Sequence, residues 1–258
     1  MVAMTSQARS LSRRTFLAGL GHGSLAIAVV SLVGCGPAAV SAEPSGAAST
    51  PSPLPPGTAP SSGAAVTWER VDLGFVSAYL LVRGGEVAVV DTGTTGGEGA
   101  IEAALSGIGL GWDAVGHVIL THLHSDHAGS SDAVLTAAPD AVGYAGAADL
   151  AGIVAPRPLT AVADGDRVFD LRIIATPGHT AGHVAVLDEV GGILVSGDAL
   201  GTDAGRAIGP NAGFTDDMDE AMRSVVKLGE LAFETLLVGH GDPIESGAAA
   251  QVKALAGG

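Results

Sequence analysis

The segment HLHSDH at positions 122–127 constrains this chain more than any other part of its sequence. It directly follows an apolar run that is typical of a buried strand. Since side chains alternate along a strand, we expect His122 and His124 to point the same way, with Asp126 and His127 on the turn that follows. Without a cation, such crowded polar groups would repel one another or lose hydration at high cost. The segment therefore predicts a metal site of the kind that binds zinc or iron.

Three more apolar, strand-like runs lead into a Gly-containing turn that carries a metal-type ligand. Their ligand-type residues are His179, Asp198 and His240. The order of buried strand, glycine turn and ligand therefore occurs four times. The complete set of candidate ligands is His122, His124, Asp126, His127, His179, Asp198 and His240.

The hydropathy pattern of the remaining chain predicts alternating strands and helices. Strands are expected at 66–71, 78–82, 87–90, 118–121, 141–144, 167–175, 183–187, 193–196 and 235–238. Helices are expected at 99–106, 127–138, 147–154, 217–228 and 248–255. Gly84-Gly85 is expected to form a hairpin turn, and Thr215 or Asp216 to cap the helix at 217–228. The order of elements alone indicates a single α/β or α+β domain.

As an ordered set, the ligand segments resemble the motifs of the metallo-β-lactamase-fold hydrolase superfamily. The matching pieces are THLHSDH at 121–127, PGHT at 177–180, GD at 197–198, GHG at 239–241 and an earlier VDTG at 90–93. The resemblance extends from about Val66 to the C-terminus. It implies an α+β fold, namely an αββα four-layer sandwich of the metallo-β-lactamase type, with the ligands along the shared edge of its two sheets.

The resemblance also implies a role for each candidate ligand. One metal ion would be held by His122, His124 and His179. A second ion would be held by Asp126, His127 and His240. Asp198 would bridge the two ions beside a bridging hydroxide. Imidazoles and carboxylates suit two divalent cations, with zinc expected first and iron or manganese as alternatives.

Two further residues are candidates for supporting roles around these ligands. By the same resemblance, Asp91 would be a structural carboxylate behind the site. His183 lies four residues after His179 and could help to orient a ligand, although an ordinary strand position is the alternative.

The Gly-rich loop 201–216 follows Asp198 and is a candidate substrate lid. Within it, Arg206 could meet a substrate carboxylate or could simply be a solvated loop residue. Phe75 and Tyr79, near the first predicted hairpin, could form a wall of the pocket. Packing in the core is the equal alternative for both.

The first 35 residues are predicted to be a signal peptide of the twin-arginine lipoprotein type. The segment SRRTFL at 12–17 resembles a twin-arginine export signal, and LVGC at 32–35 resembles a bacterial lipobox. Cys35 is the only cysteine of the chain and the expected lipidation site. These features predict an exported lipoprotein on the outer face of the cytoplasmic membrane, or a periplasmic protein. An uncleaved membrane anchor is the alternative, because the apolar stretch is near the spanning length.

Composition divides the rest of the chain into a tether and one domain. Residues 36–65 are rich in Pro, Ser, Ala and Gly and are expected to be a disordered tether, which leaves 66–258 as the hydrolase domain. The formal net charge is −15. Since nucleic-acid backbones are bound by Lys and Arg, this acidity argues against nucleic acid as a partner. It could serve solubility or a preference for cationic substrates. The expected partner is a small-molecule substrate.

The resemblance implies a dinuclear metal-dependent hydrolase that cleaves a lactone or thioester through a bridging hydroxide. Asp126 would shuttle a proton. Thioester hydrolases of the glyoxalase II type carry a C-terminal helical extension that holds glutathione, whereas only 18 residues follow His240 here. β-Lactamases with a thiolate ligand carry Cys at the position of Asp198. The ligand set is thus most similar to the lactonase and glyoxalase II branches.

Two alternatives stay open at this stage. A mononuclear-iron dioxygenase of the persulfide type shares this fold and much of its motif. A non-catalytic metal-binding lipoprotein would account for the lipobox. The full set of ligands favours the hydrolase over both, and no pattern in the sequence indicates an oligomeric state.

Overall fold

The computed structural model describes residues 63–257 of the chain. The predicted signal peptide, the lipidation site at Cys35 and all but the last three residues of the predicted tether lie outside these residues. Within 63–257, no helix is both long and apolar enough to cross a lipid bilayer.

The first half of the described chain forms a sheet whose strands lie in sequence order. Its strands are β1 (Thr67–Asp72), β2 (Ser77–Arg83), β3 (Glu86–Val90), β4 (Val115–Leu120), β5 (Val142–Gly146) and β6 (Thr160–Val162). The first two pairings are antiparallel and the remaining three are parallel. The predicted turn at Gly84-Gly85 is confirmed, since both residues have positive φ (61° and 90°), as a two-residue hairpin requires.

The second half forms another sheet, in the order β13-β10-β9-β8-β7. Its strands are β7 (Arg167–Val168), β8 (Leu171–Ala175), β9 (Val184–Asp188), β10 (Ile193–Val195) and β13 (Thr235–Leu237). Only β10 and β13 pair in parallel; the other pairs are antiparallel.

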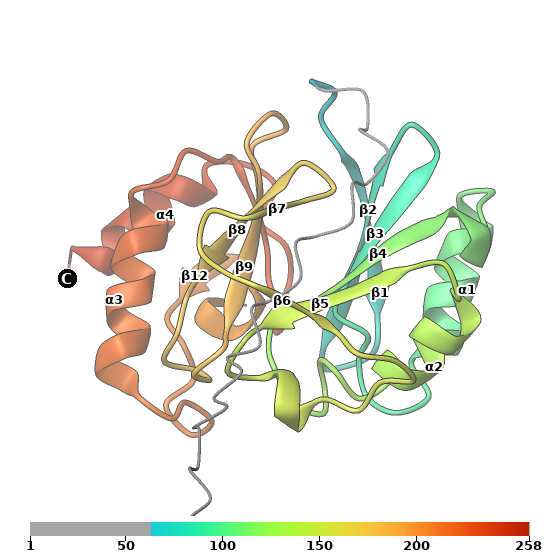
Figure 1. Cartoon of the computed structure of the whole chain (residues 1–258). Coiled ribbons are helices and arrows are strands. Elements are labelled where there is room, and N and C mark those ends of the chain that lie inside the picture. Colours follow the sequence, from blue (N-terminus) through green and yellow to red (C-terminus); the bar gives the residue numbers. More distant parts are fainter. Residues whose placement is uncertain (1–62, 258) are drawn as a thin grey trace, which may run out of the picture. The chain divides into compact units, whose positions relative to one another are not determined.

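Alternation along the strands produces three apolar layers. In β2, Tyr79 and Leu81 belong to the core between the sheets, together with residues of β8 and β9. Ala78 and Leu80 face the other way and pack with α1 (Glu98–Gly107) and α2 (Ser131–Ala137). A third core joins the second sheet to α3 (Met218–Gly229) and α4 (Ala248–Ala256). Figure 1 shows one helix pair outside each sheet, which confirms the predicted αββα sandwich.

The start of α3 differs from the prediction by one or two residues. Its N-cap is Asp217, whose carboxylate accepts a hydrogen bond from the Glu220 amide, rather than Thr215 or Asp216. Acidic residues lie in the first turn and Lys227 lies in the last turn, which complements the helix dipole. The buried face recurs at helical spacing through Ala221, Val225 and Leu228.

The helix predicted at 127–138 is shorter than expected, because its first residues form turns around the candidate ligands. The amides of His127 and Ala128 both donate to the His124 carbonyl, at 3.0 and 2.8 Å. The helix predicted at 147–154 is wrong as well, since only a 3-10 turn at Leu150–Gly152 forms there.

Two further predictions fail at residues with positive φ. The strand predicted at 167–175 is interrupted at Phe169 and Asp170, whose φ angles of 54° and 60° turn β7 back onto β8. The predicted loop 201–216 contains a hairpin of β11 (Gly201–Asp203) and β12 (Arg206–Ile208). Strand β6 was not predicted at all.

Candidate metal centre

The first three candidate ligands meet through their ring nitrogens. His122 Nε2 lies 3.1 Å from His124 Nδ1, which lies 3.0 Å from His179 Nε2. His122 and His124 follow β4 of the first sheet, whereas His179 follows β8 of the second. One atom from each residue lies within 4.8 Å of the others, a spacing at which one ion could be held.

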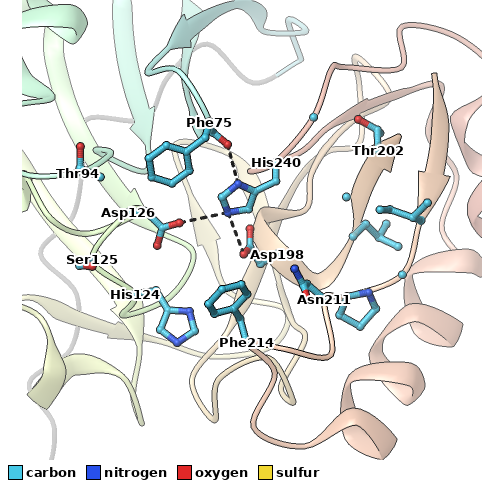
Figure 2. A pocket seen from close by; sticks show the side chains of 16 residues that line it. Phe75, Thr94, His124, Ser125, Asp126, Asp198, Thr202, Asn211, Phe214 and His240 are labelled. Atoms are coloured by element: carbon cyan, nitrogen blue, oxygen red, sulfur yellow. Dashed lines mark hydrogen bonds and ion pairs between the residues drawn. The ribbon is translucent and has the colours of Figure 1, made fainter. Parts of the chain in front are cut away.

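A second group of three lies beside the first. Asp126, His127 and His240 also offer ligand atoms within 4.8 Å of one another. His240 Nε2 lies 3.3 Å from Asp126 Oδ2, and Figure 2 shows this pair facing the pocket. The loops after β4 and β13 therefore converge at the same edge of the sandwich.

Asp198 lies between the two groups. Its Oδ2 is 3.4 Å from Nε2 of His179 and 3.3 Å from Nε2 of His240, and its Oδ1 is 3.2 Å from Nε2 of His127. A side chain at Gly239 would collide with this carboxylate, because an added Cβ would lie 2.5 Å from Asp198 Oδ1. The glycine before His240 is therefore required by the close approach of Asp198.

Four of the five imidazoles are oriented by a hydrogen bond at Nδ1. The acceptors are the Thr121 hydroxyl for His122 (3.0 Å), Asp91 for His127 (2.8 Å), the Thr215 hydroxyl for His179 (3.2 Å) and the Phe75 carbonyl for His240 (2.7 Å). Each bond leaves Nε2 turned toward the centre, as metal-binding histidines require. His124 is the exception and turns its Nδ1 inward.

Asp91 lies behind these ligands, where the sequence predicted a structural carboxylate. Its Oδ1 accepts from the Thr121 amide at 2.7 Å, and its Oδ2 accepts from the Thr121 hydroxyl and from His127 Nδ1, each at 2.8 Å. Asp91 directly follows β3, which pairs with β4, so its carboxylate reaches the start of the ligand loop. Its φ of 62° shows that the chain adopts an unfavourable conformation to present it.

His183 contacts the back of Asp198. Its Nε2 accepts a hydrogen bond from the Asp198 amide at 3.1 Å, so its Nδ1 carries the proton and donates to the Thr176 hydroxyl at 2.7 Å. Complete burial lowers the pKa of His183 to about 3, aided by the nearby His179. A neutral His183 thereby fixes the backbone that presents Asp198.

The electrostatics of the centre are set by burial and by the two carboxylates. Burial lowers the pKa of His122 well below its usual value. Burial acts in the same direction on His127, but Asp91 and Asp198 outweigh it and raise the pKa of His127 to about 10. Hydrogen bonds to Asp126 and Asp198 likewise raise the pKa of His240 to about 10.

The donor set fits two divalent cations. No residue within 63–257 hydrogen-bonds the buried Asp198 Oδ1, because His127 lies near it without hydrogen-bond geometry. A buried carboxylate oxygen without such a partner is costly unless it binds a cation. The Nε2 atoms of His122 and His179 face the centre as acceptors, because the Nδ1 atom of each ring already donates a hydrogen bond. Neutral nitrogen and carboxylate donors are the ligands of divalent transition metals.

Asp149 was missed by the sequence analysis, although it connects the ligand loops. Its buried carboxylate accepts from the Leu123 amide (3.0 Å), the Thr180 hydroxyl (2.6 Å) and the Gly182 amide (2.7 Å). The loop bearing His122 and His124 is thus joined to the loop bearing His179. The signal was present, because Asp149 follows an apolar strand and a glycine, as the candidate ligands do.

Phe75 lines the pocket, as predicted, whereas Tyr79 and Arg206 lie elsewhere. Tyr79 is buried in the core, where its hydroxyl donates to the Val238 carbonyl at 2.8 Å, so it forms no wall of the pocket. Arg206 is exposed on β12 and is not among the residues that line the pocket. Arg206 was expected in an irregular loop, but it lies in strand β12, opposite Asp203 of β11.

A pocket of about 690 Å³ opens over the candidate ligands. Its floor contains His124, Asp126, Asp198 and His240 (Figure 2). The opposite wall comes from the hairpin and the loop that follows it. The members of that wall are Leu200, Gly201, Thr202, Ile208, Gly209, Pro210, Asn211 and Phe214.

Comparison with known proteins points to one family. The sequence pattern of the metallo-beta-lactamase superfamily matches residues 71–240. A hydroxyacylglutathione hydrolase from Rhodospirillum rubrum is 35% identical over 164 residues, which are 60% of this chain and 57% of that protein. Thioesterase pkgB from Emericella nidulans is 28% identical over 180 residues, which are 67% of this chain and 50% of that protein. The chain therefore spans between half and three-fifths of the length of these two relatives.

The fold has similar solved structures. The metallo-beta-lactamase family protein TTHA1429 from Thermus thermophilus superposes with a TM-score of 0.61 and 26% sequence identity, covering 74% of this chain and 78% of that one. Together with the sequence match and the clustered His and Asp side chains, this likeness settles the family. The chain belongs to the metallo-beta-lactamase superfamily of metal-dependent hydrolases.

Proposed function

We propose that this protein is a dinuclear metal-dependent hydrolase that cleaves a small ester-like bond in a lactone or thioester. The observation that carries the proposal is the position of Asp198. Its two carboxylate oxygens lie 3.2–3.4 Å from ring nitrogens of His127, His179 and His240, which belong to both three-residue groups. Similarity to a hydroxyacylglutathione hydrolase and to a thioesterase supports an ester-like bond as the target.

In this proposal one divalent cation is held by His122, His124 and His179, and a second is held by Asp126, His127 and His240. Asp198 lies between them. When bound, two such cations polarise a carbonyl oxygen and lower the pKa of a nearby water. Zinc suits this mixture of imidazole and carboxylate donors best, with iron or manganese as the alternatives.

The protein's own residues then bind the substrate and move the proton. Asp126 is half-buried at the pocket floor, where a hydrogen bond to His240 holds the pKa of its carboxylate below the usual value. Its carboxylate is therefore ionised near neutral pH and can accept a proton in the reaction. Asp91 and His183 keep the ligands oriented, and the pocket wall excludes water from the reacting bond.

The first experiment is elemental analysis of the purified protein, with hydrolysis of a lactone and thioester panel measured on the same sample. Two metal ions per chain with turnover would support the proposal. One iron ion per chain without hydrolysis would overturn it and favour an iron dioxygenase. Bound metal with no turnover of any substrate would favour a non-catalytic metal-binding protein.

We also propose that the protein is exported and anchored to the membrane through a lipid on Cys35. The support is the sequence alone, with its twin-arginine-like segment and its lipobox-like segment. Cys35→Ala should move the protein from the membrane fraction to the soluble fraction while its hydrolytic activity stays unchanged. If the variant remains in the membrane fraction, the apolar segment is an anchor instead.

A further inference from the structure

We infer that the substrate of this pocket is uncharged and presents an apolar chain to a wall formed by Phe75, Leu200, Ile208, Pro210 and Phe214. This inference rests on the proposed function and names the class of ester that the site selects. It is carried by the juxtaposition of an exposed apolar wall with a floor of candidate metal ligands. Figure 2 shows Phe75 and Phe214 on opposite sides of Asp198 and His240.

The two aromatic rings are exposed to solvent, so neither contributes its apolar surface to the core. Phe75 and Phe214 are 66% and 68% exposed, and Ile208 beside them is 44% exposed. Single exposed apolar residues are common, but a group that lines one pocket marks a ligand surface. An apolar chain lying across these side chains would remove them from water, which is favourable in proportion to the area covered.

Away from the candidate metal centre, the pocket offers no basic partner to an anionic group of the substrate. All of its titratable lining residues belong to the candidate metal centre: His124, Asp126, Asp198 and His240. No Lys or Arg lines the pocket within residues 63–257. A substrate carboxylate held at the apolar wall, remote from the cations, would therefore lose its hydration without gaining a basic partner. Polar groups remote from the reacting bond are limited to Thr94, Ser125, Thr202 and Asn211.

Both aromatic residues are fixed relative to the reacting centre. The carbonyl of Phe75 accepts from His240 Nδ1 at 2.7 Å, and its ring stacks on the His240 imidazole with centroids 6.1 Å apart. The Phe214 amide donates to the Asn211 carbonyl, and the next residue, Thr215, contacts His179 Nδ1 at 3.2 Å. Since the backbone around each aromatic residue is linked to a candidate ligand, the wall lies at a set distance from the reacting bond.

The test is kcat/KM of the metal-loaded protein for γ-lactones with alkyl side chains from methyl to octyl, beside counterparts that end in a carboxylate. We expect kcat/KM to rise about threefold per added methylene until the wall is covered. The carboxylate-ended octyl analogue should react at least about tenfold more slowly than the neutral one.

Variants identify the wall as the cause. Phe214→Ala should flatten the dependence on chain length, and Phe214→Leu should restore much of it, because leucine keeps an apolar surface at an exposed position. Arg206→Ala is the matched control and should leave both the chain-length dependence and the charge preference unchanged. If Arg206→Ala instead abolished the hydrolysis of carboxylate-ended substrates, the charge argument would be wrong.

Failure of this inference can be separated from failure of the proposed function. Hydrolysis that ignores chain length, or that prefers carboxylate-ended lactones, would overturn the inference and leave the hydrolase in place. If no ester or thioester reacts, the proposed function fails. Calorimetry then still measures the affinity of the pocket for a hydrolysis-resistant octyl amide. The inference is overturned if the amide does not bind, or if it binds Phe214→Ala as tightly as wild type.

Discussion

The two three-residue groups of the centre differ most in their contact with solvent. His122 and His179 of the first group are buried, with 0% and 1% exposure. In the second group the side chains of Asp126 and His240 are 26% and 38% exposed, and both line the pocket. The centre therefore has a mostly closed half, of which only His124 lines the pocket, and a more open half, of which only His127 is fully buried. Function and stability should accordingly respond differently to changes in the two halves.

The largest expected effect comes from Asp198, which contacts both halves. Asp198→Asn should lower kcat on the order of a thousandfold and reduce the metal content, because an amide cannot supply the negative charge between two cations. Hydrolysis rates and elemental analysis would measure both. Asp203→Asn, an exposed change on β11, is the control and should behave as wild type. Full activity of Asp198→Asn would show that the Asp198 carboxylate does not connect two metal ions.

The second effect concerns Asp149, which supports only the closed half. Asp149→Asn should lower the free energy of unfolding by about 2–3 kcal/mol, because buried amide donors lose an ionised acceptor. Urea unfolding would measure this, with the exposed Asp140→Asn as control, expected to lie within about 0.5 kcal/mol of wild type. A cost equal to that of the control would show that Asp149 does not hold the ligand loops.

The third prediction compares the halves directly in metal-free protein. His122→Ala should cost about 2 kcal/mol of stability, since it empties a fully buried position and removes the hydrogen bond to the Thr121 hydroxyl. His240→Ala should cost less, because its side chain is partly solvated and water screens its pairs with Asp126 and Asp198. Thermal unfolding in the presence of a chelator would test the contrast. Equal costs would remove the distinction between closed and open halves.

The smallest effect lies at Tyr79, just below the centre. Burial raises the pKa of Tyr79 to about 12, above its value of about 10 in an unfolded chain. The neutral phenol is thus favoured in the folded state. Tyr79 therefore contributes its full share to the free energy of unfolding below pH 10, and this share is lost as the pH rises through about 12. Tyr79→Phe should cost about 1 kcal/mol at neutral pH, from the lost bond to Val238, and should weaken the alkaline loss of stability.

The candidate ligands could be predicted because each follows an apolar strand, and parallel or neighbouring strands bring such positions to one edge. His122, His179 and His240 illustrate this, since they come from both sheets and still converge. Tyr79 was assigned to the wrong place, and Asp149 was overlooked although it follows an apolar strand and a glycine. Whether an aromatic residue faces the core or a pocket depends on sheet pairing, and a carboxylate that supports loops has no spacing of its own.

The hairpin of β11 and β12 was missed for a related reason. Its turn uses Ala204 with a φ of 47°, a conformation that alanine rarely adopts and that no sequence pattern predicts. The same hairpin supplies Ile208 to the pocket wall. The residues that we propose to select the substrate, such as Ile208, therefore lie in the segment where local sequence propensity predicts structure least well.

The ligands of the open half are far apart in sequence, since His127 and His240 are separated by 113 residues. We expect so long a loop to close late in folding, because the chain must lose conformational entropy before the distant contacts can compensate for that loss. A nascent or truncated chain can present the early histidines but cannot complete the centre. Stoichiometric metal binding would therefore show that the two sheets have packed together. A bound ion would also stabilise the packed state, because it binds the folded chain and not the unfolded one.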